Sequence, residues 1–197
     1  MLINKSIYFV HIPRTGGRYV KELFAQNNYD FVLGDYLQWN NKETAHLCYP
    51  DYEIFLNFLE CQKFTVVRNP LDRFISGVSA DTRFNEETIN KMLGSQSSLD
   101  MYLNNIIFHD LANWFTPQIN FLNHSIKIYK FENGLKDNFF EWIKDNFNLQ
   151  LNDETAPLLK LRQEAFMAED NFKLDLSNKE KQYIENYYYK DYKILNY

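Results

Sequence analysis

The chain has 197 residues, of which 45% are hydrophobic and 17% aromatic, so it predicts one packed domain over residues 1–197. Its 21 Lys and Arg against 26 Asp and Glu give a formal net charge of −5, which argues against nonspecific nucleic-acid binding. No segment approaches the roughly 18 apolar residues of a membrane span, and no signal-peptide pattern is present. The two cysteines lack metal-ligand spacing, so we expect a reduced, cytoplasmic, metal-free protein.

Short apolar segments alternate with amphipathic ones along the chain. Strands are predicted at residues 6–12, 64–67 and 127–131, and helices at 18–26, 51–60, 71–78, 100–108, 138–147 and 177–190. Ser177 with Glu180 three residues later predicts a capping box at the start of the last helix. Strands separated by helices predict a single α/β domain with a mainly parallel sheet flanked by helices on both faces.

The turn after the first strand has the sequence His-Ile-Pro-Arg-Thr-Gly-Gly (residues 11–17). Gly16 and Gly17 allow backbone N–H groups to converge on an oxyanion, and the N-terminus of the next helix adds partial positive charge. Arg14 and Arg18 flank the loop with guanidinium donors. The alternative is a tight turn that only needs flexible backbone. The loop lacks the Gly-Lys-Ser/Thr ending of a Walker A sequence, which disfavours an ordinary ATPase, GTPase or kinase.

A second candidate anion site follows the second predicted strand. Arg68 closes that strand, Asn69 and Pro70 turn the chain, and Ser76 lies two turns into the next helix. This layout can place a guanidinium and a hydroxyl around one phosphate. The alternative is a surface arginine, an ordinary helix start and an incidental serine. A donor with 5′ and 3′ phosphates needs two such sites, whereas a simple ATP enzyme needs one.

Both loops resemble those of PAPS-dependent sulfotransferases, specifically the carbohydrate sulfotransferase branch related to heparan sulfate and chondroitin sulfotransferases. Residues 11–17 are similar to the 5′-phosphosulfate loop, usually His-Ile-Pro-Lys-Thr-Gly-Gly-Thr-Ser, and residues 67–76 resemble the 3′-phosphate motif Val-Arg-Asn-Pro-x-x-Arg-x-x-Ser. The resemblance implies a P-loop-like fold and sulfuryl transfer from PAPS to a hydroxyl, with PAP as product, a carbohydrate as the expected acceptor, and no metal. It implies donor contacts by Arg14, Thr15, Gly16, Gly17, Arg18, Tyr19, Arg68 and Ser76.

Two departures from the family pattern affect the expected chemistry. Arg14 stands where the family has a lysine, and Arg18 and Tyr19 replace the usual hydroxyl residues. An arginine keeps the positive charge but is a poor proton donor, so it can stabilise the leaving group electrostatically without protonating it. A catalytically impaired protein of the same fold, which binds PAP, PAPS or another nucleotide, is therefore the alternative reading.

The resemblance also indicates a general base for the acceptor hydroxyl. His46 precedes the 3′-phosphate strand, as the base does in related carbohydrate sulfotransferases, and imidazole titrates near neutral pH. His109 is the second choice for this role. His11 occupies a position of structural character in the family, and His124 reads as a surface residue.

Three later segments, residues 115–122, 129–133 and 184–197, also resemble the family and bear on the fold more than on the chemistry. Acceptor specificity is expected in loops drawn from residues 28–45, 79–112 and 152–176. Gln118 could line the acceptor cleft. Aromatic side chains in or near these loops could stack on sugar rings or simply pack: Tyr36, Trp39, Phe84, Tyr102 and Trp114.

Overall fold

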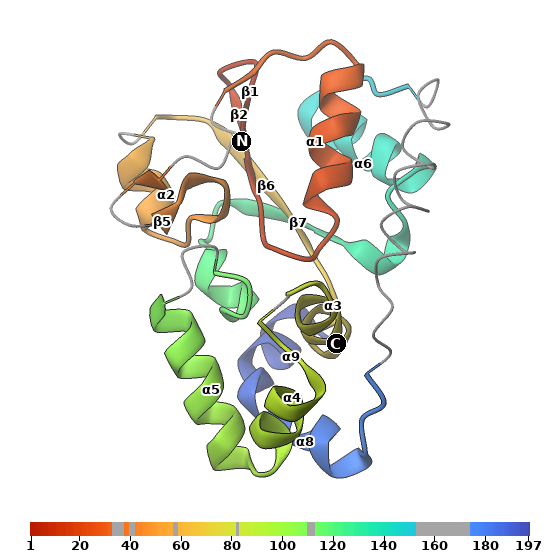
Figure 1. Cartoon of the computed structure of the whole chain (residues 1–197). Helices are drawn as coiled ribbons and strands as arrows, with labels where there is room; N and C mark the ends of the chain where they lie inside the picture. The colour runs from red at the N-terminus through yellow and green to blue at the C-terminus, as the bar shows by residue number, and fades with distance from the viewer. Residues whose placement is uncertain (33–37, 40–41, 57–58, 82, 110–112, 153–173) are drawn as a thin grey trace.

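A computed structural model describes residues 1–32, 38–39, 42–56, 59–81, 83–109, 113–152 and 174–197. They contain a five-stranded sheet in the order β3-β1-β2-β6-β7 (Figure 1). The strands are β1 (Leu2–Ile3), β2 (Ile7–Val10), β3 (Phe31–Val32), β6 (Gln62–Val67) and β7 (Ile126–Lys130). β2, β6 and β7 are parallel, whereas β1 pairs antiparallel with both β2 and β3. The predicted α/β class is confirmed, and the sheet is mixed.

The antiparallel edge of the sheet arises from a tight hairpin at the start of the chain. Asn4 and Lys5 both have positive φ angles, 47° and 58°, and the N–H of Ser6 donates to the carbonyl of Ile3 at 3.1 Å. Two consecutive residues with positive φ are typical of a turn that joins neighbouring antiparallel strands. The strand predicted at residues 6–12 is therefore only the second arm of this hairpin.

Helices cover both faces of the sheet. α1 (Gly17–Gln26) and α6 (Asp137–Phe147) pack on one face, and the short α2 (Asp51–Phe55) lies on the other (Figure 1). The core beneath α1 and α6 is rich in aromatic residues, with Phe64 of β6 within ring contact of Phe9 and Phe139. This packing buries both faces of the central strands, as their continuous apolar sequences require.

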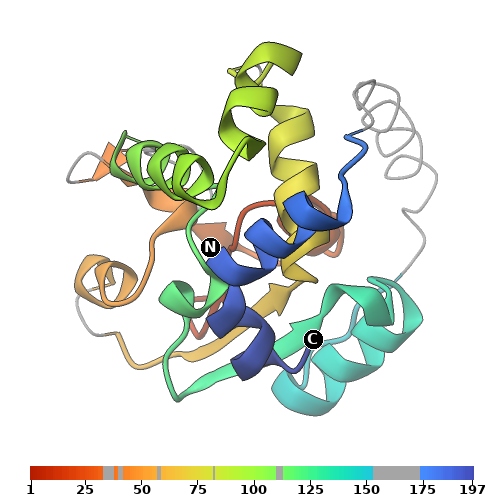
Figure 2. The same cartoon turned by 90° about the horizontal axis from the view of Figure 1, so that it is seen from below.

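A group of helices lies beyond the carboxyl end of β6 (Figures 1 and 2). It comprises α3 (Pro70–Ala80), α4 (Glu86–Leu93), α5 (Gln96–His109), α8 (Asn178–Tyr187) and α9 (Tyr189–Leu195). Phe74, Phe115 and Tyr188 are fully buried in the core that these helices share. The remaining short elements are β4 (Gln38–Trp39), β5 (Lys42–Glu43), η1 (Thr44–His46), η2 (Gln118–Phe121) and η3 (Phe131–Asn133). The loops that leave β2 and β6 run between the sheet and this helical group.

Several local expectations are confirmed. Pro70 is the first residue of α3, and the side chain of Asn69 accepts hydrogen bonds from the N–H groups of Leu71 and Asp72. Ser177 and Glu180 form the predicted capping box at the start of α8. The helix expected over residues 51–60 is shorter, because α2 ends at Phe55.

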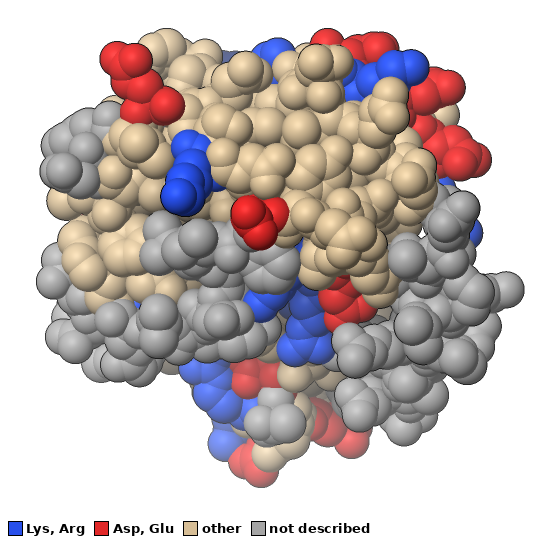
Figure 3. Space-filling view, turned by 90° about the horizontal axis from the view of Figure 1, so that it is seen from above, with Lys and Arg blue, Asp and Glu red and all other residues tan. Residues whose placement is uncertain are grey.

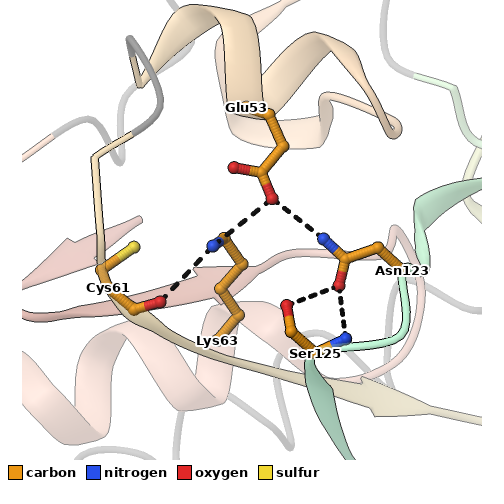
Figure 4. Close-up of polar contacts among 5 residues, drawn as sticks. All are labelled: Glu53, Cys61, Lys63, Asn123 and Ser125. Carbon is orange, nitrogen blue, oxygen red and sulfur yellow. Dashed lines mark hydrogen bonds and ion pairs between the residues drawn. The ribbon is translucent and has the colours of Figure 1, made fainter.

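A partly buried ion pair braces the opposite end of β6 from the loop at Arg68. The Lys63 ammonium lies 3.3 Å from the Glu53 carboxylate, which also accepts a 2.9 Å hydrogen bond from Asn123 (Figure 4). Lys63 also donates to the Cys61 carbonyl at 3.4 Å. The cluster ties α2 to β6 and to the turn before β7.

Replacing Glu53 with glutamine should lower the free energy of unfolding by about 2 kcal/mol, because a hydrogen-bonded charge that opposes a nearly buried ammonium is lost. Urea unfolding at neutral pH measures this change. Glu60→Gln is the matched control, since Glu60 is exposed and should tolerate the same substitution within about 0.5 kcal/mol. Equal stability of the two variants would contradict a stabilising role for this pair.

Candidate anion-binding and catalytic site

The first loop passes through two residues with a left-handed backbone before α1 begins. Arg14 and Gly16 adopt positive φ angles of 67° and 89°, and Gly17 is the first residue of α1. No side chain among the described residues caps the N-terminus of α1. The first N–H groups of any helix lack intrahelical acceptors, so this end of α1 can receive an anion.

Two residues of the first loop, Gly17 and Thr15, maintain its conformation. A Cβ atom on Gly17 would lie 1.9 Å from the His11 ring, so no other residue fits without displacing that histidine. The Thr15 hydroxyl donates a 2.8 Å hydrogen bond to the Ile12 carbonyl, and Thr15 is fully buried. Thr15 was predicted as a donor to the anion, and in this structure its hydroxyl braces the turn.

The two predicted loops meet through Arg14 and Ser76. The Arg14 guanidinium donates to the Ser76 Oγ from both Nε, at 3.1 Å, and Nη2, at 2.9 Å. The same guanidinium lies 5.6 Å from the centre of the Trp114 ring. Ser76 is on α3 and Arg14 is on the first loop, so residues 62 positions apart in the chain form one polar cluster.

Arg68 lies against the same cluster. Its Nη1 is 3.5 Å from the Arg14 carbonyl oxygen, and its guanidinium stacks 4.9 Å from the centre of the Phe131 ring. A Cβ atom on Gly16 would approach that phenylalanine ring to 3.0 Å, which places the stacked pair beside the glycine turn. The guanidiniums of Arg14 and Arg68 therefore belong to one site between the two loops.

Arg73 is buried next to the site and is not accessible to a ligand. It is 2% exposed, and its guanidinium donates to three backbone carbonyls: those of Pro13 at 2.9 Å, Thr116 at 3.0 Å and Trp114 at 2.8 Å. One side chain thus fixes the first loop to the segment that carries Trp114. These three hydrogen bonds give Arg73 a structural role next to the site.

His46 lies next to the first loop. Its ring makes an edge contact with the His11 ring at 4.4 Å between centroids, and its Nδ1 is 2.9 Å from a carboxylate oxygen of Glu43. Its carbonyl accepts a 2.9 Å hydrogen bond from Asn113. His46 is only 5% exposed. The sequence interpretation did not identify Glu43 or Asn113, although a carboxylate three residues before a candidate base is a signal that could have been used.

Burial lowers the pKa of His11 well below its usual value, and the neighbouring His46 and Arg18 lower it further. Below the unfolded-state pKa of about 6.5, the unfolded chain binds a proton at this residue and the folded chain does not. Stability is therefore retained above that pH and lost as the pH falls, by about 1.4 kcal/mol per pH unit for one such group.

The stability loss should be visible in urea unfolding between pH 7.5 and pH 5.5. We expect His11→Asn to flatten this pH dependence, whereas replacement of the exposed His124 with asparagine should leave it unchanged. Identical pH profiles for the wild type and the His11 variant would contradict the assignment.

The other predicted residues are distributed around this site. Arg18 is exposed in the first turn of α1, and Tyr19 packs against the core under α1. In the view of Figure 3, several Lys and Arg side chains lie close together, with Asp and Glu side chains among them. A local basic group is therefore compatible with the net charge of −5.

The aromatic residues considered for sugar stacking differ in position. Trp39 is in ring contact with Phe55, and Phe84 with Phe115, so both contribute to packing. Tyr102 also packs against the core of the helical group. Tyr36 lies outside the described residues, and of the other four the structure brings Trp114 to the site, beside Arg14. Much of the predicted specificity loops, residues 33–37, 40–41, 82, 110–112 and 153–173, also lies outside them.

Comparison of the chain with protein-family models, curated protein sequences and solved structures returned no match. Within the described ranges, no helix has the length and apolar character needed to cross a bilayer. The same residues contain no group of three or more His, Cys, Asp or Glu side chains arranged to hold a metal ion.

Proposed function

We propose that this chain is a PAPS-dependent sulfotransferase that transfers a sulfuryl group to a hydroxyl, with a carbohydrate as the acceptor. The observation that carries the proposal is the convergence of Arg14, Arg68 and Ser76 on one site beside the N-terminus of α1. Two guanidiniums, a hydroxyl and a helix N-terminus together favour a ligand with more than one phosphate or sulfate group. A bisphosphorylated adenosine such as PAP has this property.

In the proposed reaction the acceptor hydroxyl attacks the sulfur of PAPS in line with the leaving phosphate. A new O–S bond forms as the S–O bond to the 5′-phosphate breaks, and PAP departs with the bonding electron pair. His46 accepts the proton of the acceptor hydroxyl. Its Nδ1 faces Glu43, which favours a proton on that nitrogen and leaves Nε2 as the basic atom.

Arg14 is proposed to stabilise the negative charge that develops on the transferring group and on the leaving phosphate. A guanidinium keeps its charge throughout, so it contributes electrostatics rather than a proton. In the structure Arg14 contacts Ser76, the proposed ligand of the 3′-phosphate. The side chains proposed to bind the 5′-phosphosulfate and the 3′-phosphate of the donor would thus be in direct contact.

A second candidate function is nucleotide binding without transfer. Its specific support is Arg14 itself. The Arg14 guanidinium donates to Ser76 from two nitrogens and cannot protonate the leaving phosphate, so the site can bind a nucleotide without supporting transfer. Sulfur-labelled PAPS with a broad panel of hydroxyl acceptors separates the two functions. Transfer of label establishes the transferase, and PAP binding without any transfer establishes the binding protein.

Donor binding is tested by calorimetry with PAP. The wild type should bind PAP, and Arg68→Ala should weaken binding by about 10- to 100-fold, because a charge-assisted hydrogen bond of about 1.5–3 kcal/mol is lost. Lys91→Ala removes an exposed charge on α4 and should leave PAP affinity unchanged. Magnesium-dependent ATP binding without PAP binding would contradict the proposal and favour a kinase-like protein.

A further inference from the structure

The most unusual contact near the site is made by Gln118, a fully buried side chain of η2. Its Oε1 accepts the backbone N–H of Arg68 at 3.0 Å, and its Nε2 donates to the backbone carbonyl of the same residue at 2.8 Å. β6 ends at Val67, so Arg68 lies just beyond the strand pairing of the sheet. The carboxamide gives Arg68 both of the backbone hydrogen bonds that a neighbouring strand would otherwise provide.

Gln118 is itself fixed from the C-terminal helices. The fully buried carboxylate of Asp191 accepts the backbone N–H groups of Gln118 at 2.8 Å and of Ile119 at 3.1 Å. The Tyr188 hydroxyl donates to the Phe115 carbonyl at 2.7 Å a few residues earlier. The segment that presents the Gln118 carboxamide is therefore anchored to α8 and α9 before it reaches Arg68.

These contacts leave Gln118 unsuited to bind a ligand directly. It has no exposed surface, and both polar atoms of its side chain are engaged with the backbone of Arg68. The acceptor-cleft role considered for Gln118 is therefore replaced by an internal one. Arg68 has its guanidinium held against Phe131 and its backbone held by Gln118, so its position is defined at both ends.

We infer that Gln118 is a positioning residue of the donor site: held by Asp191, it fixes the backbone of Arg68 so that the guanidinium is preorganised for the 3′-phosphate of PAPS. The inference rests on the proposed function. Preorganisation raises affinity because less conformational freedom is lost when the ligand binds. Gln118 acts only through Arg68, and this sets it apart from a residue that merely stabilises the fold.

The test is a double-mutant cycle on PAP affinity measured by calorimetry. Gln118→Met keeps the side-chain length and removes both hydrogen bonds, and it should weaken PAP binding by about 10-fold. In an Arg68→Ala background the same substitution should change PAP affinity by less than about 2-fold, because the group that Gln118 positions is gone. Independent, multiplicative effects of the two substitutions would overturn the inference.

A second readout compares PAP with 5′-AMP, which lacks the 3′-phosphate. Gln118→Met should reduce the preference for PAP over 5′-AMP, whereas a purely structural role would weaken both ligands equally and would overturn the inference. Gln182→Met is the matched control, since it makes the same change at an exposed position of α8 and should preserve the preference.

Should Gln118→Met fail to fold, Asp191→Asn keeps the shape of the anchor and should reduce the same preference by a smaller factor. A wild type that binds PAP, with the preference unaltered in the variants, overturns this inference alone. A wild type that does not bind PAP overturns the proposed function as well.

Discussion

His46→Ala is expected to lower kcat by about 10²- to 10⁴-fold, the usual contribution of a general base. The Kd for PAP should stay within about 2-fold of the wild type, because His46 lies next to the His11 ring and Glu43 rather than among the guanidiniums. Label transfer from PAPS measures turnover, and calorimetry measures PAP binding on the same preparation.

His124→Ala is the control for the loss of an imidazole, since His124 is exposed near the start of β6, at the far end of that strand from Arg68. Because His46 is buried, thermal unfolding of the variant must show a folded protein before its rate is interpreted. Full turnover in a folded His46→Ala protein would discard His46 as the base. An equal loss of turnover and PAP affinity would instead indicate a role in donor binding.

Arg73→Met is expected to lower the free energy of unfolding by about 4 kcal/mol or more. The substitution removes the donors to three backbone carbonyls in a buried environment, and each unsatisfied group costs about 1–3 kcal/mol. The affected carbonyls belong to Pro13, Trp114 and Thr116, so the first loop and the segment behind it lose their common anchor. Urea unfolding of the wild type and the variant measures the loss.

Lys91→Met is the control for the loss of a cationic side chain, because the Lys91 side chain is 62% exposed and its ion pair with Glu87 lies on the surface of α4. It should cost less than about 1 kcal/mol. A comparable cost for both substitutions would mean that the buried position of Arg73 has no special importance.

The features that could be predicted from the sequence are those encoded by neighbouring residues. Asn69 followed by Pro70 predicts the start of α3, and the serine–glutamate spacing at 177–180 predicts the start of α8, because capping depends on contacts over three or four residues. α4 was missed although Asn85 caps it in the same way. Residues 79–112 were predicted as a specificity loop, and the capping signal at Asn85 was therefore not used.

The parts of the site that could not be predicted depend on contacts between distant segments. Gln118 binds the backbone of a residue 50 positions away, and Asp191 reaches Gln118 across 73 positions. Neither contact leaves a periodic or compositional trace in the sequence. The two-residue strands β1 and β3 were missed for a related reason, since so short a segment carries no alternation of apolar and polar residues.

The close fit of Gly17 against His11 has an evolutionary consequence. A methyl group at position 17 would overlap the imidazole at 1.9 Å, so alanine or any larger residue there requires a smaller side chain at position 11. The reverse change, a smaller residue at position 11, would in turn relax the selection that keeps position 17 a glycine. These two positions should therefore covary during divergence, with a smaller residue at position 11 preceding any change at position 17.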